Sequence, residues 1–121
     1  MLQAVLSSSA CQIIRLNIIG NAVGDQGIQV IGRSLVANKS LTFLDARSNS
    51  ISSAGLRTLV DPLLVNCILV TLDLRGNSID QMIALQLRKH LFNQGSKLTV
   101  HCSYEEDSFV ERYVICFHIF R

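Results

Sequence analysis

A 28-residue repeat limits what this chain of 121 residues can fold into. When the sequence is shifted by 28 positions, leucines fall over leucines and asparagines over asparagines in three successive blocks. The leucine column holds Leu16, Leu44 and Leu72, and the asparagine column holds Asn21, Asn49 and Asn77. Units this short cannot bury an apolar face alone, so neighbouring units must share one core. The repeat therefore predicts a stack of similar units.

Each unit has the pattern of a strand, a turn and a helix. In the third unit, Leu72 and Leu74 alternate with polar residues, as in a strand with one buried face. In the second unit, Leu56, Leu59 and Leu63 recur at three- and four-residue steps, as in a helix with one buried side. Clusters of Gly, Ser and Asn between the two parts favour turns. The units span residues 13–40, 41–68 and 69–96, and a partial fourth unit spans 97–102.

Strands that alternate with helices in this way must run parallel, with the helices on one side of the sheet. Neighbouring strands lie about 4.8 Å apart, whereas helix axes need about 8–10 Å. This mismatch bends the stack, with strands on a concave wall and helices on a convex wall. The predicted fold class is therefore α/β, with parallel strands lining the concave face.

The repeat resembles a known family. Residues 41–63 follow the pattern LxxLxLxxNxIxxxGxxxLxxxL, with Ala46 at one leucine position. This pattern is similar to the leucine-rich repeat of the ribonuclease-inhibitor type, and the resemblance covers about residues 13–102. It implies a right-handed solenoid, a segment of a horseshoe, that serves as a cytoplasmic protein-binding scaffold. It does not imply a particular partner, because many functions share this fold.

Some positions depart from the repeat pattern. Gly27 and Gly55 are expected where a helix approaches a strand closely, and Ile83 stands in their column in the third unit. The third helix must therefore accept a larger side chain against its neighbour. Pro62 lies inside the second helix and has no backbone N–H to donate. We expect this helix to kink or to end near residues 60–61.

The two ends of the chain lie outside the complete repeats. Residues 1–12 are predicted to be the remnant helix and turn of a preceding unit whose strand is absent. Residues 103–121 are predicted to form a C-terminal tail or capping helix, because Phe109, Tyr113 and Phe117 recur at helical spacing. A strand is the alternative for this segment, since it is rich in β-branched and aromatic residues.

The outward side chains of the strands form the candidate surface for another protein. By alternation, they are Arg15, Phe43, Asp45, Arg47, Thr71, Asp73, Arg75 and His101. Exposed Asp and Arg side chains could simply pair, at about 0.2–1 kcal/mol per pair. Alternatively, Phe43 and the arginines anchor a partner, because such residues are enriched at interface hot spots. In that case, reversing Arg47 and Arg75 to Glu should weaken binding and leave the melting temperature nearly unchanged.

Two further expectations concern structure rather than recognition. Asn21, Asn49 and Asn77 are expected to form a structural ladder, because an amide can satisfy backbone groups left open where a strand leaves the sheet. The ends of so short an array are open to solvent. A second functional hypothesis is therefore a structural or assembly segment of a longer repeat protein, which self-associates through its uncapped ends or its C-terminal helix.

Several function classes are disfavoured. A net charge of +2, with 11 basic and 9 acidic residues, gives no basic footprint for nucleic acid, and no apolar run is long enough for membrane insertion. The 4 cysteines are far apart, which favours free buried thiols in a reducing compartment over a metal site. Asp45, Asp73 and His101 share a column, but an open wall does not exclude water. We therefore expect no enzyme activity and no cofactor.

Overall fold

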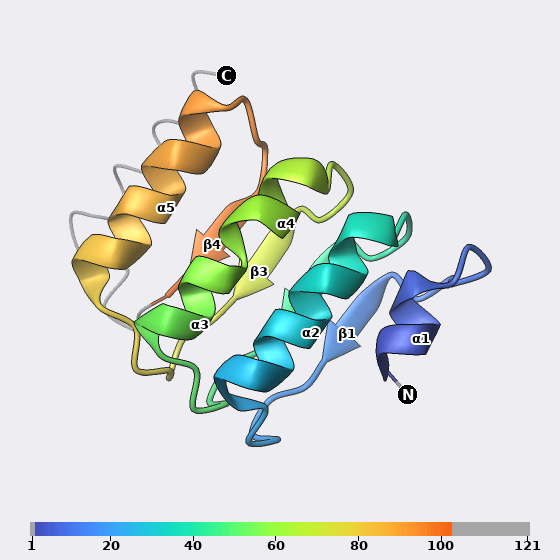
Figure 1. Ribbon diagram of the computed structural model, residues 1–121, viewed down its shortest axis with the longest axis horizontal. Helices are drawn as coiled ribbons and strands as arrows, with labels where there is room; N and C mark the ends of the chain where they lie inside the picture. The colour runs from blue at the N-terminus through green and yellow to red at the C-terminus, as the bar shows by residue number, and fades with distance from the viewer. Residues whose placement is uncertain (1, 103–121) are drawn as a thin grey trace.

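Four short parallel strands follow one another in sequence order in the computed structural model, which describes residues 2–102 (Figure 1). The strands are β1 (Arg15–Asn17), β2 (Phe43–Asp45), β3 (Thr71–Asp73) and β4 (Thr99–His101). Their register aligns Leu16, Leu44, Leu72 and Val100. Each pairing joins residues 28 positions apart, so the period of the sequence is also the register of the sheet.

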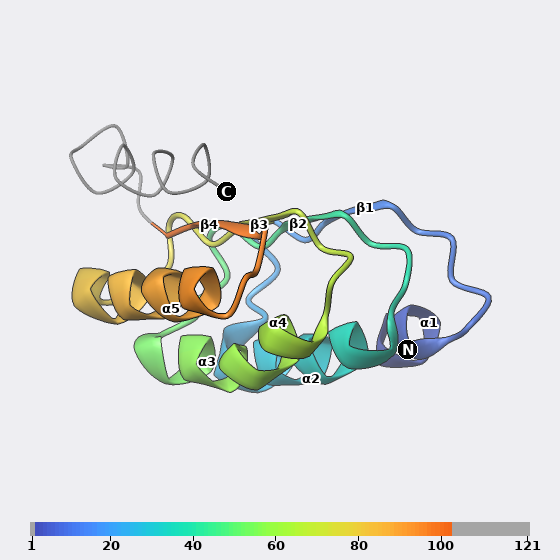
Figure 2. The ribbon, with the colours of Figure 1, turned by 90° about the horizontal axis from the view of Figure 1, so that it is seen from above.

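The helices lie on one side of this sheet, as Figure 2 shows from above. They are α1 (Leu2–Ser7), α2 (Gly24–Ala37), α3 (Ser53–Thr58), α4 (Val60–Val65) and α5 (Gln81–Asn93). The described residues therefore form an α/β fold of two layers, a parallel sheet and a row of helices. None of the helices between residues 2 and 102 has the length and apolarity needed to cross a membrane.

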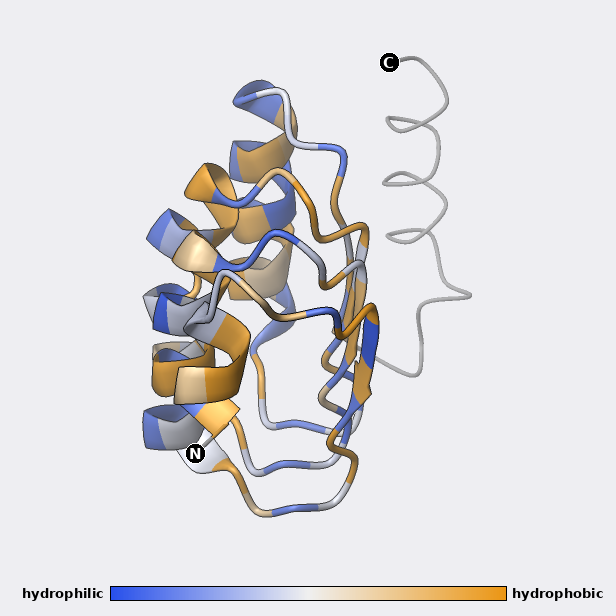
Figure 3. Ribbon diagram, turned by 90° about the vertical axis from the view of Figure 1, so that its right-hand side faces the viewer, coloured by the Kyte–Doolittle hydropathy of each residue, from blue (hydrophilic) through white to orange (hydrophobic). Residues whose placement is uncertain are grey.

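The core lies between the two layers, where Figure 3 shows apolar residues on both the strands and the helices. Leu44 and Leu72 of the strands and Leu35, Leu56 and Leu59 of the helical segments are fully buried. Every second strand residue points inward, which is why the leucine column fills this layer. Each buried leucine contributes about 1.5–3 kcal/mol relative to an exposed one.

The second helical segment is interrupted. It is split into α3 and α4 at Leu59, which has φ −85° and ψ −14°. Pro62 cannot donate a hydrogen bond to the carbonyl group of Thr58, so a continuous helix would lose a bond at this point. The interruption agrees with the expected effect of Pro62, but it lies just before residues 60–61. Ser52 begins α3 as a side-chain cap, because its hydroxyl group accepts a hydrogen bond from the N–H of Ala54.

The glycine column has a different neighbour from the one expected. A Cβ atom at Gly55 would overlap the carboxylate of Asp25, which lies in the first turn of α2, and one at Gly27 would overlap the side chain of Val23. The close contact is therefore with a turn and an adjacent helix, and the predicted approach of helix to strand is wrong. Asp25 accepts hydrogen bonds from the N–H (2.7 Å) and the hydroxyl group (2.6 Å) of Ser52, and these bonds lower the pKa of its carboxyl group.

The prediction for the C-terminal segment lies outside the described residues. The N-terminal segment contains a short helix, α1, whose residue Leu6 is fully buried against the core. No strand within residues 2–102 precedes β1 in the sheet.

Candidate protein-interaction surface

The face of the sheet that points away from the helices carries side chains in register. One row consists of Arg15, Phe43, Thr71 and Thr99, which are neighbours in the strand pairing. Arg15 is exposed, and its guanidinium carbon lies 4.0 Å from the centroid of the Phe43 ring. This cation–π contact fixes two large side chains at the β1–β2 end of the row. The other two members are threonines and are partly exposed.

The second row differs from the prediction. Asp45 and Asp73 were expected to be exposed, but only 5% and 4% of their surfaces are accessible. The reason is that the side chains of Arg47 and Arg75 fold back over them. Each arginine is about a third exposed, with 32% and 34% of the side chain accessible. His101, the last member of this row, is partly exposed.

Each aspartate accepts three side-chain hydrogen bonds from its arginine, one of them the longer of two from Nε. The Nε and Nη2 atoms of Arg47 lie 2.9 and 2.8 Å from the Oδ1 and Oδ2 atoms of Asp45. The same atoms of Arg75 lie 2.9 and 2.6 Å from Asp73. A weaker contact of 3.7 Å joins Arg47 to Asp73 across the strands. Paired hydrogen bonds of this kind fix the orientation of a guanidinium group, so both arginines are held in place on the sheet.

This geometry changes an expectation about stability. Removing Arg47 or Arg75 would leave a buried carboxylate without its cation, which is costly. The Arg47 hydrogen bond is also the main reason that the pKa of the Asp45 carboxyl group lies below its ordinary value of 3.8. The prediction that charge reversal at both arginines leaves the melting temperature unchanged is therefore not compatible with the burial of their partners.

The Asp45–Arg47 pair should make stability depend on pH. The pKa of Asp45 is lower in the folded chain than in the unfolded chain, so the pair stabilises the fold above the ordinary value of 3.8. This contribution is lost as the pH falls through the lowered folded value. We expect the difference in unfolding free energy between the wild type and Asp45→Asn to be largest near neutral pH and to shrink below about pH 4. Urea unfolding at several pH values measures it.

The matched control for this experiment is Asp61→Asn, which removes an exposed aspartate from α4. Its effect on the free energy of unfolding should be small near neutral pH, since a surface charge contributes about 0–1 kcal/mol. A gap between the wild type and Asp45→Asn that stays constant down to about pH 2 would show that the pair does not carry this pH dependence.

The asparagine column links successive turns. The Oδ1 atom of Asn49 accepts hydrogen bonds from the N–H groups of Asn21 (2.9 Å) and Val23 (3.3 Å). The Oδ1 atom of Asn77 accepts in the same way from Asn49 and Ile51, both at 2.9 Å. Their amide nitrogens donate back to backbone carbonyl groups, which include those of the preceding unit. These side chains are occupied with backbone groups and leave little for a ligand.

A second amide column was not assigned a role from the sequence. Asn38 and Asn66 follow the helices α2 and α4, and both are buried. The amide nitrogen of Asn38 donates to the carbonyl group of Leu6, and that of Asn66 donates to the carbonyl group of Leu35. Each therefore ties the end of one unit's helical segment to the helix of the preceding unit. The signal in the sequence was the amide residue at the end of each unit.

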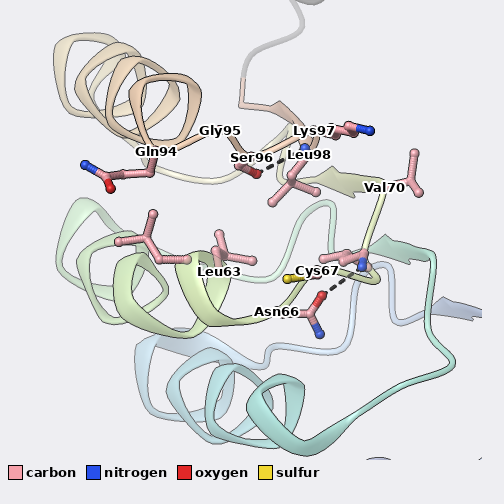
Figure 4. A pocket seen from close by; sticks show the side chains of 11 residues that line it. Leu63, Asn66, Cys67, Val70, Gln94, Gly95, Ser96, Lys97 and Leu98 are labelled. Carbon is pink, nitrogen blue, oxygen red and sulfur yellow. Dashed lines mark hydrogen bonds between the residues drawn. The ribbon is translucent and has the colours of Figure 1, made fainter. Parts of the chain in front are cut away.

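A cleft of about 370 Å³ lies between the loops that follow α4 and α5 (Figure 4). Its walls include Leu63, Cys67, Val70 and Leu98. Figure 2 shows α5 set closer to the sheet than α3. The amide of Asn66 lines the cleft but already bonds to backbone groups. The cleft therefore has mixed walls, because Gln94, Ser96 and Lys97 line it beside the apolar side chains.

The cysteines do not all follow the prediction of buried thiols. Cys102 is buried, but Cys67 is exposed because it lies in the loop after α4. Cys11 is partly buried, and a hydrogen bond from the hydroxyl group of Ser40 lowers the pKa of its thiol. Within residues 2–102, no three His, Cys, Asp or Glu side chains come together as metal ligands.

Comparison with known proteins supports the fold. No known family model matches the chain, and no curated protein matches its sequence. Among solved structures, the chain is similar to the one described as leiomodin-1 actin-binding site 2, with a TM-score of 0.74. The match covers 98% of this chain and 70% of that chain, at 18% sequence identity. At this identity the likeness concerns the fold alone.

Proposed function

We propose that this chain is a leucine-rich-repeat module that binds another protein through the outer face of its sheet. In this proposal the stack is a segment of a right-handed horseshoe, and the outer face of the sheet lies on its concave side. The curvature follows from the closer spacing of strands than of helices. The observation that carries the proposal is the set of arginine and aromatic side chains that the face holds in fixed positions. They are Arg47 and Arg75, clamped by buried aspartates, and Arg15 stacked on Phe43.

Fixed side chains favour binding for a physical reason. A protein interface must order the side chains that it uses, at a cost of about 0.5–1.5 kcal/mol for each long side chain. The clamped arginines have already lost most of this freedom in the unbound chain. Arg and aromatic residues are also the types that most often dominate binding energy. The face is therefore suited to a partner that presents carboxylate or carbonyl groups.

Binding without catalysis is part of this proposal. A general base works best with a pKa near the working pH. The carboxyl group of Asp45 has a pKa below its ordinary value and is occupied by Arg47. We also propose a cytoplasmic location, in keeping with the resemblance of the repeat. Actin is the first partner to test, because the similar solved structure is described as an actin-binding site.

A binding experiment tests the face directly. The variant Phe43→Ala/Thr71→Glu changes the centre of the face and leaves both Asp–Arg pairs in place. We expect it to weaken partner binding at least about tenfold, because it removes an aromatic anchor and adds a carboxylate beside the clamped arginines. Affinity for actin is measured by co-sedimentation, and other partners are captured from a cell lysate and quantified.

The matched control carries the same kinds of change on the helix side. In Val36→Ala/Gln86→Glu, the first change truncates an exposed apolar side chain on α2, and the second adds one negative charge on α5. It should bind as the wild type does. Equal binding by the wild type and both variants would exclude the outer face as the binding site. Loss of binding in the control alone would place the site on the helices.

A second candidate function is assembly through the open end of the stack. Leu16 and Ile18 are only partly buried, whereas the equivalent residues Leu44 and Ala46 of the second unit are fully buried. An assembly segment would cover these residues with another copy. Its solution mass, measured by light scattering over a range of concentrations, should then rise above that of the 13.4 kDa chain.

A further inference from the structure

Strand β1 lies at the edge of the four-stranded sheet, and this edge is distinct from the outer face. We propose that this edge binds an extended segment of another polypeptide as an additional parallel strand. The segment has apolar side chains on its inward side and an acidic side chain on its outward side, and it is followed by a turn. Four features of the described residues support this proposal.

The first feature is the hydrogen-bonding pattern of β1. The carbonyl group of Ile14 accepts hydrogen bonds from the second unit, and the N–H of Ile18 donates 2.9 Å to the carbonyl group of Asp45. Backbone groups of a parallel strand alternate between its two sides. Those of Arg15 and Asn17 therefore face away from β2. No strand within residues 2–102 lies on that side, so the groups are available to an added strand.

The second feature is the incomplete burial of the core at this edge. Ile13, Leu16 and Ile18 are partly buried, although the equivalent positions in later units are closed by the preceding strand. Val5 of α1 is 42% exposed. Helix α1 lies on the helix side of the stack near β1 (Figure 2). The inward side chains of an added strand would therefore have both α1 and the edge of the core to pack against.

The third feature is the first position of the asparagine ladder. The Oδ1 atoms of Asn49 and Asn77 each accept two N–H groups from the turn of the preceding unit. The Nδ2 atom of Asn21 donates to carbonyl groups in its own turn, those of Ile18 and Ile19. Its Oδ1 atom accepts no hydrogen bond from residues 2–102. Asn21 can therefore receive two N–H groups from a turn that follows an added strand.

The fourth feature identifies the kind of occupant. Asn21 lies beyond the C-terminal end of β1, so only a parallel segment brings its own turn to this side chain. Two copies paired edge to edge about a two-fold axis would run antiparallel, and their turns would lie at opposite ends. Arg15 forms no ion pair with a residue between 2 and 102. In the register of the ladder, an outward acidic residue equivalent to Asp45 lies beside Asn17, one diagonal position from Arg15, where the long arginine side chain can reach it. A segment of a different polypeptide can supply both this acidic residue and the parallel turn.

A synthetic peptide provides the probe. The peptide LTFLDARSNSI copies residues 41–51, whose turn supplies two N–H groups to Asn77 within the chain. We expect the fluorescently labelled peptide to bind the full 121-residue chain in an anisotropy titration. The control peptide exchanges the residues copied from Leu44 and Asp45, which moves the apolar side chain outward. It should bind at least about tenfold more weakly, since one apolar contact is lost and one carboxylate is buried.

Protein variants locate the binding to the edge. Arg15→Pro removes an N–H that faces away from β2, so it blocks an added strand while keeping the pairing with β2. Arg15→Ala is its control, because it removes the same charge and keeps the N–H. We expect Arg15→Pro to bind the peptide at least fivefold more weakly than Arg15→Ala does. Asn21→Ala should also weaken binding about fivefold, since two hydrogen bonds to the turn are lost.

Four results would overturn the proposal. They are no binding of the peptide to the wild type, equal binding of the two peptides, equal binding by Arg15→Pro and Arg15→Ala, and an oligomer that Arg15→Pro dissociates. The last result would assign the edge to a second copy of the chain. Phe43→Ala/Thr71→Glu should still bind the peptide, so failure of the edge and failure of the outer face can be told apart.

Discussion

Replacing Asn49 by alanine is expected to lower the free energy of unfolding by about 3–5 kcal/mol, because four hydrogen bonds from a fully buried side chain are lost and the partly buried backbone groups that made them are left without partners. Asn49 is fully buried. Its Oδ1 atom accepts hydrogen bonds from the N–H groups of Asn21 (2.9 Å) and Val23 (3.3 Å). Its Nδ2 atom donates to the carbonyl groups of Ile18 and Arg47, both at 2.9 Å. Urea unfolding followed by circular dichroism measures the change.

Asn21→Ala is the matched control, since it removes the same amide group from the same column. Asn21 is exposed, and its side chain bonds only to the carbonyl groups of its own turn. Water can replace these bonds, so we expect a loss of less than about 1 kcal/mol. If the two variants lose the same stability, the ladder is not what joins the first and second units.

The arrangement of the strands could be predicted from the sequence because one number governs it. A period of 28 residues places Leu16, Leu44 and Leu72 at the same depth in successive units, and the strand pairing has that same offset. Alternation along each strand then decides which side chains point toward the helices. The α/β class and the parallel sheet follow from these two facts.

Alternation gives the direction of a side chain but not its burial, and the candidate surface differs from the prediction for this reason. Asp45 points away from the helices as expected, yet it is buried because Arg47, two residues later on the same face, folds over it. The same contact joins the two opposite charges in one ion pair. Residues two apart on a strand lie on one side, so the pairing was foreseeable, whereas its depth depends on the neighbouring strands.

The links between units were the hardest features to predict. The hydrogen bond from Asn66 to the carbonyl group of Leu35 joins residues 31 positions apart. Its length depends on how closely successive helices pack, which a single unit of the repeat does not determine. The exposure of Cys67 has a similar origin, because its position in a loop depends on where α4 ends.

Reversal of both arginine charges, Arg47→Glu/Arg75→Glu, is expected to lower the free energy of unfolding by about 3–5 kcal/mol in total. This is less than twice the loss for one fully buried ion pair, because water partly screens the exposed arginines. Each substitution removes three side-chain hydrogen bonds from a buried carboxylate. It also brings a second negative charge beside that carboxylate. Asp73 is affected twice, because it contacts both arginines. Thermal unfolding at neutral pH should show the loss as a lower melting temperature.

A rescue experiment separates charge from packing in this prediction. Adding Asp45→Asn and Asp73→Asn to the double variant removes the buried negative charges but keeps side chains of nearly the same shape. We expect the quadruple variant to regain about half of the lost stability, since the repulsion disappears while the ion pairs stay absent. A melting temperature unchanged by the double reversal would contradict the ion-pair geometry. A quadruple variant no more stable than the double one would indicate that the arginines act through their packing over the sheet and not through their charge.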